Sequence, residues 1–300
     1  MQKALFGVML ICVFLIGACQ PASESIEGGN SPSSASDQAD RIVATTVSAT
    51  ELADALDLEL VGIPSSYKAL PERYDDVTEL GNPMSPDAEQ IRQLQADVVW
   101  SVTTLQGDLE ESFTTAGIEA EFLNFQSVEE MSHEIERIGK RYDREKEASA
   151  LVETFDRRLS ELEQKNADRN EPSVLILMGV PGSYLVATEH SYIGDLVELA
   201  GGTLAVEADE NVEYLASNTE YLQQANPDLI LRAAHGMPEE VIEMFDEEFK
   251  SNDVWKHFQA VEKGRVYDLE ESLFGTTGNI AVLEALDALE EMLYPEEDEG

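Results

Sequence analysis

Cysteine is almost absent from this chain of 300 residues, which contains only Cys12 and Cys19. Both lie near the start, so the remaining sequence offers no thiol for a disulfide or for a cysteine metal site. Histidine is also scarce, and His133, His190 and His257 lack the paired spacing of metal ligands. The fold must therefore be stabilised by an apolar core, for which a hydrophobic content of 43% is sufficient.

Positive charge is the second thing that the sequence has little of. Lys and Arg total 19 against 61 Asp and Glu, which gives a net charge of −42. Such a surface repels phosphate backbones and anionic lipid headgroups, and this excludes nucleic acid as a partner. We interpret the acids, which are spread along the chain, as a solvated surface suited to a salty or alkaline exterior.

A long apolar run occurs only at the start of the chain. Lys3 precedes an apolar stretch at 4–16 that is too short to span a membrane. The small residue Ala18 then precedes Cys19, as cleavage requires. The pattern predicts a lipoprotein signal peptide, residues 1–18, cleaved before Cys19, whose thiol is then lipidated. An ordinary secretory signal with a chance cysteine is the alternative.

The rest of the chain divides by composition and periodicity. Ser, Gly, Pro and acids after the signal predict a flexible tether. Strand and helix patterns then alternate, interrupted by one long amphipathic helix, which predicts an α/β fold of two lobes with mainly parallel sheets joined by a single backbone helix. The expected boundaries are tether 19–39, N-terminal lobe 40–142, interlobe helix 143–170, C-terminal lobe 171–294 and acidic tail 295–300.

Two stretches of the sequence share a loose pattern in which a serine opens a helix and an acid starts the next strand. Glu89 lies eight residues before Asp97, and Glu220 lies eight residues before Asp228. Helix-then-strand units of this kind are common, so duplication and coincidence both stay open on spacing alone.

His235 has the most suggestive position of the four histidines. It follows the expected strand 228–233 and precedes a helix that Pro238 is expected to start. Ligands of open parallel sheets bind beyond the carboxyl ends of the strands. Gly236 would let the backbone approach a ligand closely. The alternative is a structural histidine satisfied by its neighbours.

Met84 is a second candidate ligand. It precedes Ser85, the expected N-cap of a helix, but Glu89 stands where a hydrophobic staple would need an apolar partner. A thioether is a soft ligand suited to haem iron or Cu(I). Met84 from one lobe and His235 from the other could hold a planar group between them, whereas Met237 is too close to His235 to reach the opposite face.

Two other motifs fail their tests. Ser65 and Lys68 match the Ser-x-x-Lys motif of serine hydrolases, but the accompanying Lys-Thr-Gly is absent. The segment 179–184 lacks the lysine of a phosphate-binding loop.

Long strings of the chain carry a resemblance to a known family. These are "RIVATTVSATELADALDLELVGIP", "LMGVPGSYLVAT", "LRAAHGMPEEVIEMFDEEF" and "VYDLEES". Over residues 41–293 the chain resembles the class III, helical-backbone substrate-binding lipoproteins of iron-complex ABC importers, and within them the haem-binding lipoproteins of the iron-regulated surface determinant system. The resemblance implies haem (iron protoporphyrin IX) between the lobes, with its iron bound axially by Met84 and His235, and no catalysis.

The resemblance also implies partners and a location. Family members dock on an ABC permease, which works with its ATPase, through one carboxylate per lobe, and Glu89 and Glu220 are the candidates here. Haem would arrive from a surface donor protein. The protein would be a monomer held on the extracellular face of a Gram-positive cell membrane by lipid on Cys19.

Haem propionates would need N–H groups or bases that offset the negative charge of the chain. Thr46 and Val47 follow the first expected strand, just before a helix that Ser48 and Glu51 are expected to open as a capping box. The full set of candidate haem contacts is Thr46, Val47, Lys68, Val102, Thr103 and Arg232.

Two other functions stay open at this point. A siderophore or cobalamin receptor on the same fold would use Arg, Tyr and Trp, and the Met84 and His235 pair would be incidental. A haem-processing enzyme, or a hydrolase using Ser65 and Lys68, would belong to another class.

Overall fold

The computed structural model describes residues 40–295, except for 209–210, 219–221 and 223–224. The expected signal peptide, Cys19, the tether and Glu220 lie outside the described residues, as do residues 296–300 of the expected tail. No helix in the described part of the chain combines the length and the apolar character that crossing a bilayer requires.

A parallel sheet of five strands organises the first lobe, in the order β3-β2-β1-β4-β5. Its central strands are short apolar runs, as expected for strands covered on both faces. The strands are β1 (Ile42–Ala44), β2 (Leu60–Ile63), β3 (Thr78–Glu79), β4 (Val98–Val102) and β5 (Ala120–Leu123).

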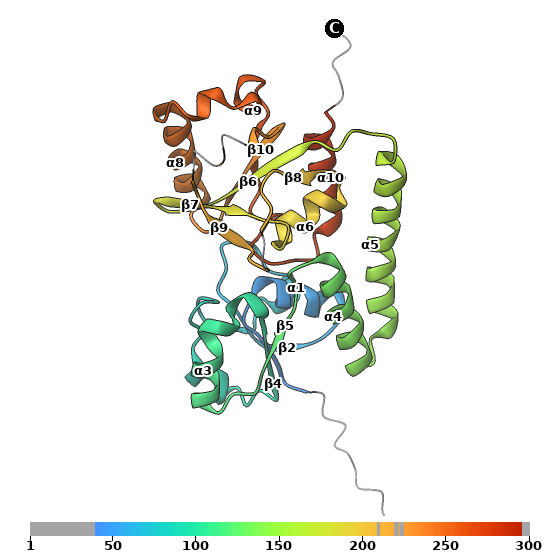
Figure 1. Cartoon of the computed structure of the whole chain (residues 1–300). Helices are drawn as coiled ribbons and strands as arrows, with labels where there is room; N and C mark the ends of the chain where they lie inside the picture. The colour runs from blue at the N-terminus through green and yellow to red at the C-terminus, as the bar shows by residue number, and fades with distance from the viewer. Residues whose placement is uncertain (1–39, 209–210, 219–221, 223–224, 296–300) are drawn as a thin grey trace, which may run out of the picture. The chain divides into compact units, whose positions relative to one another are not determined.

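Helices cover both faces of this sheet (Figure 1). Ile42 and Ala44 of β1 pack into the core that contains α1 and α4, whereas Val43 packs into the core that contains α2 and α3. The helices are α1 (Val47–Ala55), α2 (Ala88–Gln93), α3 (Gln106–Ala116) and α4 (Val128–Arg141), with short 3-10 turns η1 (Glu72–Tyr74) and η2 (Thr103–Leu105).

A mixed sheet organises the second lobe, in the order β11-β10-β6-β7-β9, with β8 also paired to β6. β10 and β11 run parallel to β6, whereas β7 returns antiparallel as a hairpin. The strands are β6 (Ser173–Val180), β7 (Ser183–Ala187), β8 (Thr203–Leu204), β9 (Tyr214–Ala216), β10 (Leu229–Ala234) and β11 (Val266–Leu269).

The second sheet is also covered on both faces. One face packs with α6 and α10 into the same apolar core that contains α1, α4 and α5, and the other packs against α8, η3 and α9. The core that includes α6 and α10 is therefore continuous through both lobes. The elements are α6 (Tyr192–Leu199), α8 (Pro238–Ser251), η3 (Trp255–His257), α9 (Gln259–Glu262) and α10 (Val282–Leu293).

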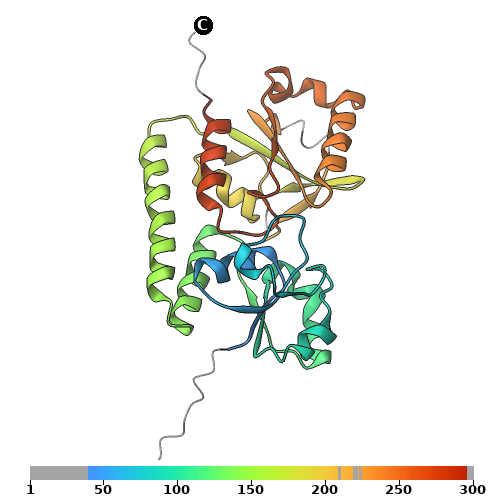
Figure 2. The same cartoon turned by 180° about the vertical axis from the view of Figure 1, so that it is seen from behind.

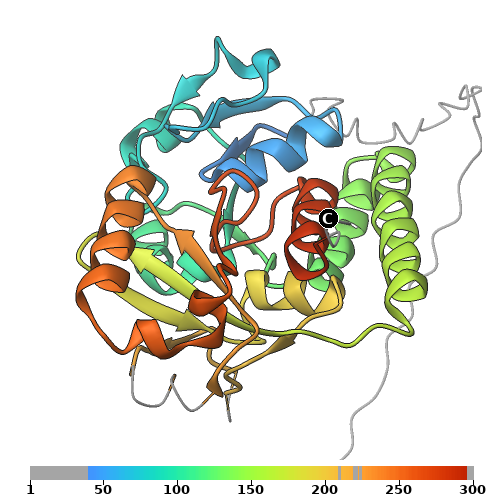
Figure 3. The same ribbon diagram turned by 90° about the horizontal axis from the view of Figure 1, so that it is seen from above.

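One long helix, α5 (Glu145–Asn166), runs beside both lobes (Figures 1 and 2). Its apolar stripe is buried against them, and α4 approaches it so closely that a Cβ at Gly139 would lie 2.4 Å from the Cβ of Ala148. At the other end it lies next to α10, as the view from above shows (Figure 3).

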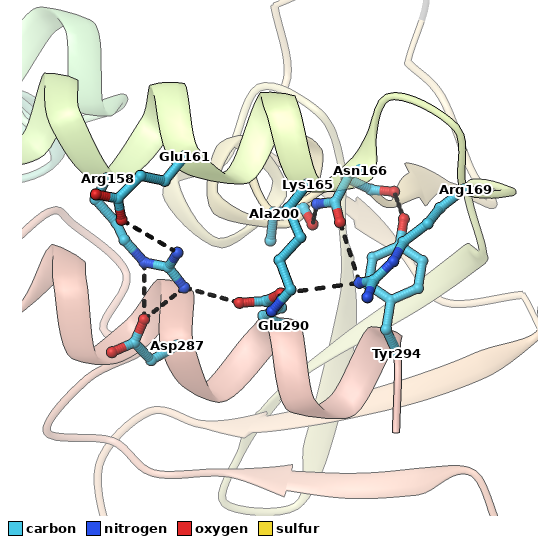
Figure 4. A network of polar contacts seen from close by, with 10 residues as sticks. Arg158, Glu161, Lys165, Asn166, Arg169, Ala200, Asp287, Glu290 and Tyr294 are labelled. Atoms are coloured by element: carbon cyan, nitrogen blue, oxygen red, sulfur yellow. Dashed lines mark hydrogen bonds and ion pairs between the residues drawn. The ribbon is translucent and has the colours of Figure 1, made fainter. Parts of the chain in front are cut away.

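Charged groups fix α5 to α10 (Figure 4). Arg158 donates to Glu290 at 2.9 Å, Lys165 pairs with the other carboxylate oxygen, and Arg169 lies 3.8 Å from it. Asp287 provides a further acceptor for Arg158 at 2.8 Å. Three of the scarce bases thus surround a single glutamate, which secures the connecting helix to the second lobe.

The predicted α/β architecture is confirmed, but two predicted helix starts are wrong. α1 begins at Thr46, whose hydroxyl accepts from Ala49 N at 3.3 Å, so Ser48 and Glu51 form no capping box. α2 begins two residues later than predicted from Ser85, because Asp87 and not Ser85 is its N-cap. In both cases a nearby oxygen on a residue with extended backbone angles forms the cap instead.

Candidate functional site

The loops that follow the parallel strands of the two sheets contact each other. Lys68, after β2, donates from its ammonium to the carbonyl oxygen of Ser272, after β11, at 3.3 Å. On the other side, the amide of Gly278 donates to the carbonyl oxygen of Phe125, after β5, at 2.7 Å. The carboxyl ends of both sheets therefore face the same boundary between the lobes, which is where open α/β sheets bind ligands.

Two half-buried carboxylates also join the lobes. Asp195 of α6 accepts from the amide of Val128 at 2.8 Å, and Glu213 accepts from the side chain of Gln126 at 2.6 Å. Burial raises the pKa of Asp195 to about 6, although the hydrogen bond from Val128 lowers it. Burial likewise raises the pKa of Glu213, against the bond from Gln126. Ionising these two groups at the boundary therefore costs folding free energy.

Met84 lies in the loop between β3 and α2. Its side chain is 53% exposed, and its amide donates to the side chain of Asn82 at 2.8 Å. The loop is tied to the neighbouring loop after β2, because Ser65 donates from its amide to the carbonyl oxygen of Gly81 at 2.9 Å. Gly81 has φ +85°, a conformation that favours glycine. The thioether is therefore available to a ligand on a backbone held by local hydrogen bonds.

His235 is exposed at the end of β10. Its amide donates to the carbonyl oxygen of Gly179, at the end of β6, at 2.9 Å. The next residue, Gly236, donates from its amide to Glu271 at 2.9 Å. Pro238 is the first residue of α8, as predicted, with Met237 as its N-cap. The imidazole thus lies at a strand exit, and the backbone around it is bonded to the end of β6 and to the loop after β11.

Met84 and His235 follow strands that neighbour the two strands whose loops meet between the lobes. β3 is the neighbour of β2, and β10 is the neighbour of β11; neighbouring strands are about 4.8 Å apart. The loops after β2 and β11 carry Lys68 and Ser272, which bond to each other. Each candidate ligand is therefore one strand away from a residue that joins the lobes.

The start of α1 faces the same boundary, since it follows directly on β1, the central strand. Thr46 is its N-cap, and no acid lies in its first turn. Glu51, in the second turn, is buried and forms an ion pair with Lys68 at 2.6 Å. The chain has a net charge of −42, yet no acidic side chain lies in the first turn of α1. The positive end of the helix dipole and the first backbone amides therefore favour binding of an anion here.

β4 pairs with β1, and its last residue, Val102, exposes less side chain to a ligand than the sequence led us to expect. Val102 is buried, with 1% of its surface exposed, so only its backbone could meet a ligand. Thr103 begins η2, and its hydroxyl oxygen is buried with no hydrogen-bond partner among the described residues.

Lys68 is already engaged, because its ammonium contacts both Glu51 and Ser272. Its supposed hydrolase partner, Ser65, donates instead to Glu79 at 3.0 Å. No contact between Ser65 and Lys68 side chains is found in the described part of the chain, so the hydrolase alternative has no support in the geometry.

Arg232 faces away from the expected contact. It donates to both oxygens of Asp268 at 2.7 and 2.6 Å and to Asp246 at 2.9 Å. Its guanidinium also lies over the rings of Phe245 and Phe249 of α8. Alternation along β10 directs this side chain to the sheet face covered by α8, so the geometry does not support Arg232 as a ligand contact.

Of the two candidate docking acids, only Glu89 is described. It is exposed in the first turn of α2, where Gln93 donates to its carboxylate at 3.4 Å. Glu220 and the lipidation candidate Cys19 lie outside the described residues.

Two residues near the site were not predicted. Tyr67, next to Lys68, is fully exposed, and Glu271 supports the loop that carries His235. An aromatic beside Lys68 and the acids after the strand of "VYDLEES" were the available signals. Neither Tyr67 nor Glu271 could be predicted to be functional, because the sequence alone does not show which loops lie next to each other in the fold.

Two α/β lobes with facing strand ends, joined by one long helix, are the architecture of substrate-binding proteins. The chain belongs to the periplasmic binding protein family, whose model matches residues 42–273. Members of this family bind substrates for transporters and are not enzymes.

Individual proteins also show high sequence identity and structural similarity to this chain. The chain is 43% identical over 290 residues, 96% of each chain, to the "High-affinity heme uptake system protein IsdE" of Staphylococcus aureus strain Newman. The crystal structure of S. aureus IsdE complexed with heme has a TM-score of 0.83 and 45% identity, covering 86% of this chain and 100% of that one. An ABC transporter substrate-binding protein from Listeria monocytogenes EGD-e has a TM-score of 0.81 and 57% identity, covering 86% and 99%. The family resemblance drawn from the sequence is confirmed.

Proposed function

We propose that this protein is a receptor that captures haem between its lobes and delivers it to the permease of an ABC importer for iron acquisition. The observation that supports the proposal is the strand order: Met84 and His235 follow β3 and β10, which neighbour β2 and β11, the strands whose loops meet at Lys68 and Ser272. It is supported by 43% identity to a heme uptake protein and by the likeness to a relative solved with heme.

Met84 and His235 would bind the iron of the haem substrate from opposite faces. Both are neutral ligands, and a thioether raises the reduction potential of the iron relative to stronger donors. With both axial positions filled, oxygen or peroxide has no open site at the iron. The ligand set therefore suits transport of intact haem and disfavours a haem-processing activity.

The propionates would be received at the start of α1. Thr46 and Val47 lie at a helix terminus whose first turn carries no acid, and Thr103 adds a buried hydroxyl without a partner among the described residues. Lys68 would have to share its ammonium with Glu51, so we assign it a supporting role. Arg232 receives no role in ligand binding, because Asp268 and Asp246 occupy its donors.

The partners follow from the same proposal. Glu89 and Glu220 would dock the lobes onto the permease, whose ATPase drives transport. A surface donor protein would supply haem, and lipid on Cys19 would hold the monomer on the extracellular face of a Gram-positive membrane. Replacing Glu89 and Glu220 with Ala should abolish haem-dependent growth of cells while leaving haem binding by the purified protein unchanged.

Absorption spectroscopy of the purified protein titrated with ferric haem tests the ligand assignment. We expect a low-spin, six-coordinate spectrum that His235→Ala and Met84→Leu each convert to a high-spin form, with affinity reduced about tenfold or more. Met237→Leu is the matched control, because Met237 is similarly exposed, at 49% against 53% for Met84, and should leave the spectrum unchanged.

A wild-type haem spectrum in both His235→Ala and Met84→Leu would remove this site from the proposal. Failure to bind haem, together with binding of a ferric siderophore or cobalamin, would turn the protein into a receptor for that other class of substrate.

A further inference from the structure

The backbone that carries His235 adopts an unfavourable conformation. Gly236 has φ +69° and Met237 has φ +50°, so two successive residues lie in the left-handed region. Met237 has a β-carbon, and this region is strained for such a residue. Met237 is also the N-cap of α8 without a side-chain hydrogen bond to the helix. The loop therefore needs support from outside its own sequence.

Two hydrogen bonds supply that support. His235 N–H donates to the carbonyl oxygen of Gly179 at 2.9 Å, which continues the pairing of β10 with β6. Gly236 N–H donates to a carboxylate oxygen of Glu271 at 2.9 Å. The second bond is the stronger kind, because its acceptor is ionised. The bond from Gly236 to Glu271 also holds the backbone at the point where the chain leaves the sheet.

Glu271 comes from the loop after β11, the strand next to β10. Its neighbour Ser272 accepts the bond from Lys68 of the first lobe. A single short loop therefore contacts both the backbone beside His235 and the opposite lobe. The position of Glu271 is fixed from two sides, which makes it a firm support for the His235 loop.

We propose that Glu271 is a positioning residue for the iron-binding histidine, an inference that rests on the proposed function. By accepting from Gly236 N–H, its carboxylate fixes the turn after His235 and so the direction in which the imidazole leaves the strand. Contacts to the imidazole of a metal-binding histidine typically change metal affinity by 10- to 100-fold when removed, and a contact to the backbone of the next residue acts in the same direction. Glu271 touches neither the iron nor the porphyrin in this role.

Three substitutions separate the hydrogen bond from the charge. Glu271→Gln keeps the length and an acceptor oxygen but removes the charge. Glu271→Asp keeps the charge but shortens the side chain by one methylene, and Glu271→Ala removes both. Glu270→Gln is the matched control: Glu270 is an exposed acid of the same loop whose carboxylate accepts from the hydroxyl of Ser272, a bond that glutamine can keep, and its replacement changes the net charge equally.

The measurement is the rate at which ferric haem leaves the purified, lipid-free protein for an excess of a haem scavenger, together with the absorption spectrum. We expect Glu271→Ala and Glu271→Asp to release haem about tenfold faster and to show a mixture of low- and high-spin forms. Glu270→Gln should behave like wild type, and Glu271→Gln, which keeps a neutral acceptor, should release haem at a rate between those of wild type and Glu271→Ala. Retained thermal stability of each apo-protein would show that the fold is intact.

Two results would overturn the inference: wild-type release and spectrum in Glu271→Ala and Glu271→Asp, or a defect in Glu271→Gln as large as in Glu271→Ala. His235→Ala distinguishes these from failure of the proposed function. If His235→Ala loses the low-spin spectrum while the Glu271 variants do not change, only the positioning role fails. If His235→Ala also keeps the wild-type spectrum, the iron ligand itself is misassigned.

Discussion

Asp195 illustrates how single residues set the energetics of the boundary between the lobes. Burial raises the pKa of its carboxyl to about 6 in the folded protein, from an ordinary value of 3.8. The folded state therefore binds more protons than the unfolded state between about pH 4 and pH 6. Stability falls as pH rises through this window, and above it the full cost of the buried charge is present.

Asp195→Asn should therefore stabilise the protein at neutral pH. Asparagine keeps an oxygen that can accept from the amide of Val128 but carries no charge. We expect a gain on the order of 2 kcal/mol at pH 7 that disappears towards pH 4. Urea denaturation of both proteins across this range measures it, and a difference that does not vary with pH would contradict the pKa argument.

Several residue-level predictions were limited by long-range contacts. Arg232 was expected at the ligand, but it pairs with Asp268, which lies 36 residues away in sequence. Lys68 was expected to contact haem, but it pairs with Glu51 and reaches Ser272 across the lobes. His235 was easier to place, because a strand exit followed by Gly and Pro depends only on local sequence.

At the scale of elements, α5 and α10 are held together by charge as well as by apolar packing (Figure 4). Hydrogen bonds from Lys165 and Arg158 lower the pKa of Glu290 despite its partial burial. A lowered pKa means that this stabilisation is present at neutral pH and is lost as acid protonates Glu290. The contact matters because it anchors the helix that joins the lobes.

Glu290→Gln should reduce the free energy of unfolding by about 2–3 kcal/mol, since it removes the negative charge that three cations share, although glutamine keeps one acceptor oxygen. Asp287→Asn is the control, because this carboxylate is 63% exposed and, among the described residues, forms its ion pair with Arg158; it should cost about 1 kcal/mol or less. Denaturant midpoints measure both. Equal losses of unfolding free energy in the two variants would show that the cluster around Glu290 contributes no more stability than an exposed ion pair.

Elements with strong periodicity were predicted closely. The strand expected at 228–233 is β10 (Leu229–Ala234), and the interlobe helix expected at 143–170 contains α5 (Glu145–Asn166). The start of α2 was missed because three oxygen-bearing residues, Ser85, Asp87 and Asn82, are close together, and the backbone decides which of them caps. Short strands such as β3 gave no signal, since two exposed residues have no pattern.

At the scale of the whole molecule, the net charge of −42 dominates long-range electrostatics. Most acids have no base to pair with, and repulsion among them favours the expanded, unfolded chain. Salt shortens the reach of this repulsion from about 10 Å at 0.1 M to about 3 Å at 1 M.

The melting temperature should therefore rise steadily between 0.05 and 1 M salt at pH 7, by several degrees, as the repulsion is screened. Sodium chloride and potassium chloride should act alike, because screening depends on ionic strength. An unchanged or falling melting temperature would show that the acids are not in net repulsion in the folded state.

The apolar core that passes through both lobes and α5 has a consequence for how the protein can be divided. Neither half encloses a complete interior, so a fragment comprising one sheet and its helices would expose the surface that normally meets the other half. The intact chain should melt in one calorimetric transition, and either fragment alone should aggregate when expressed. Gene truncations at the connecting helix are thus unsuited to mapping ligand binding to one side.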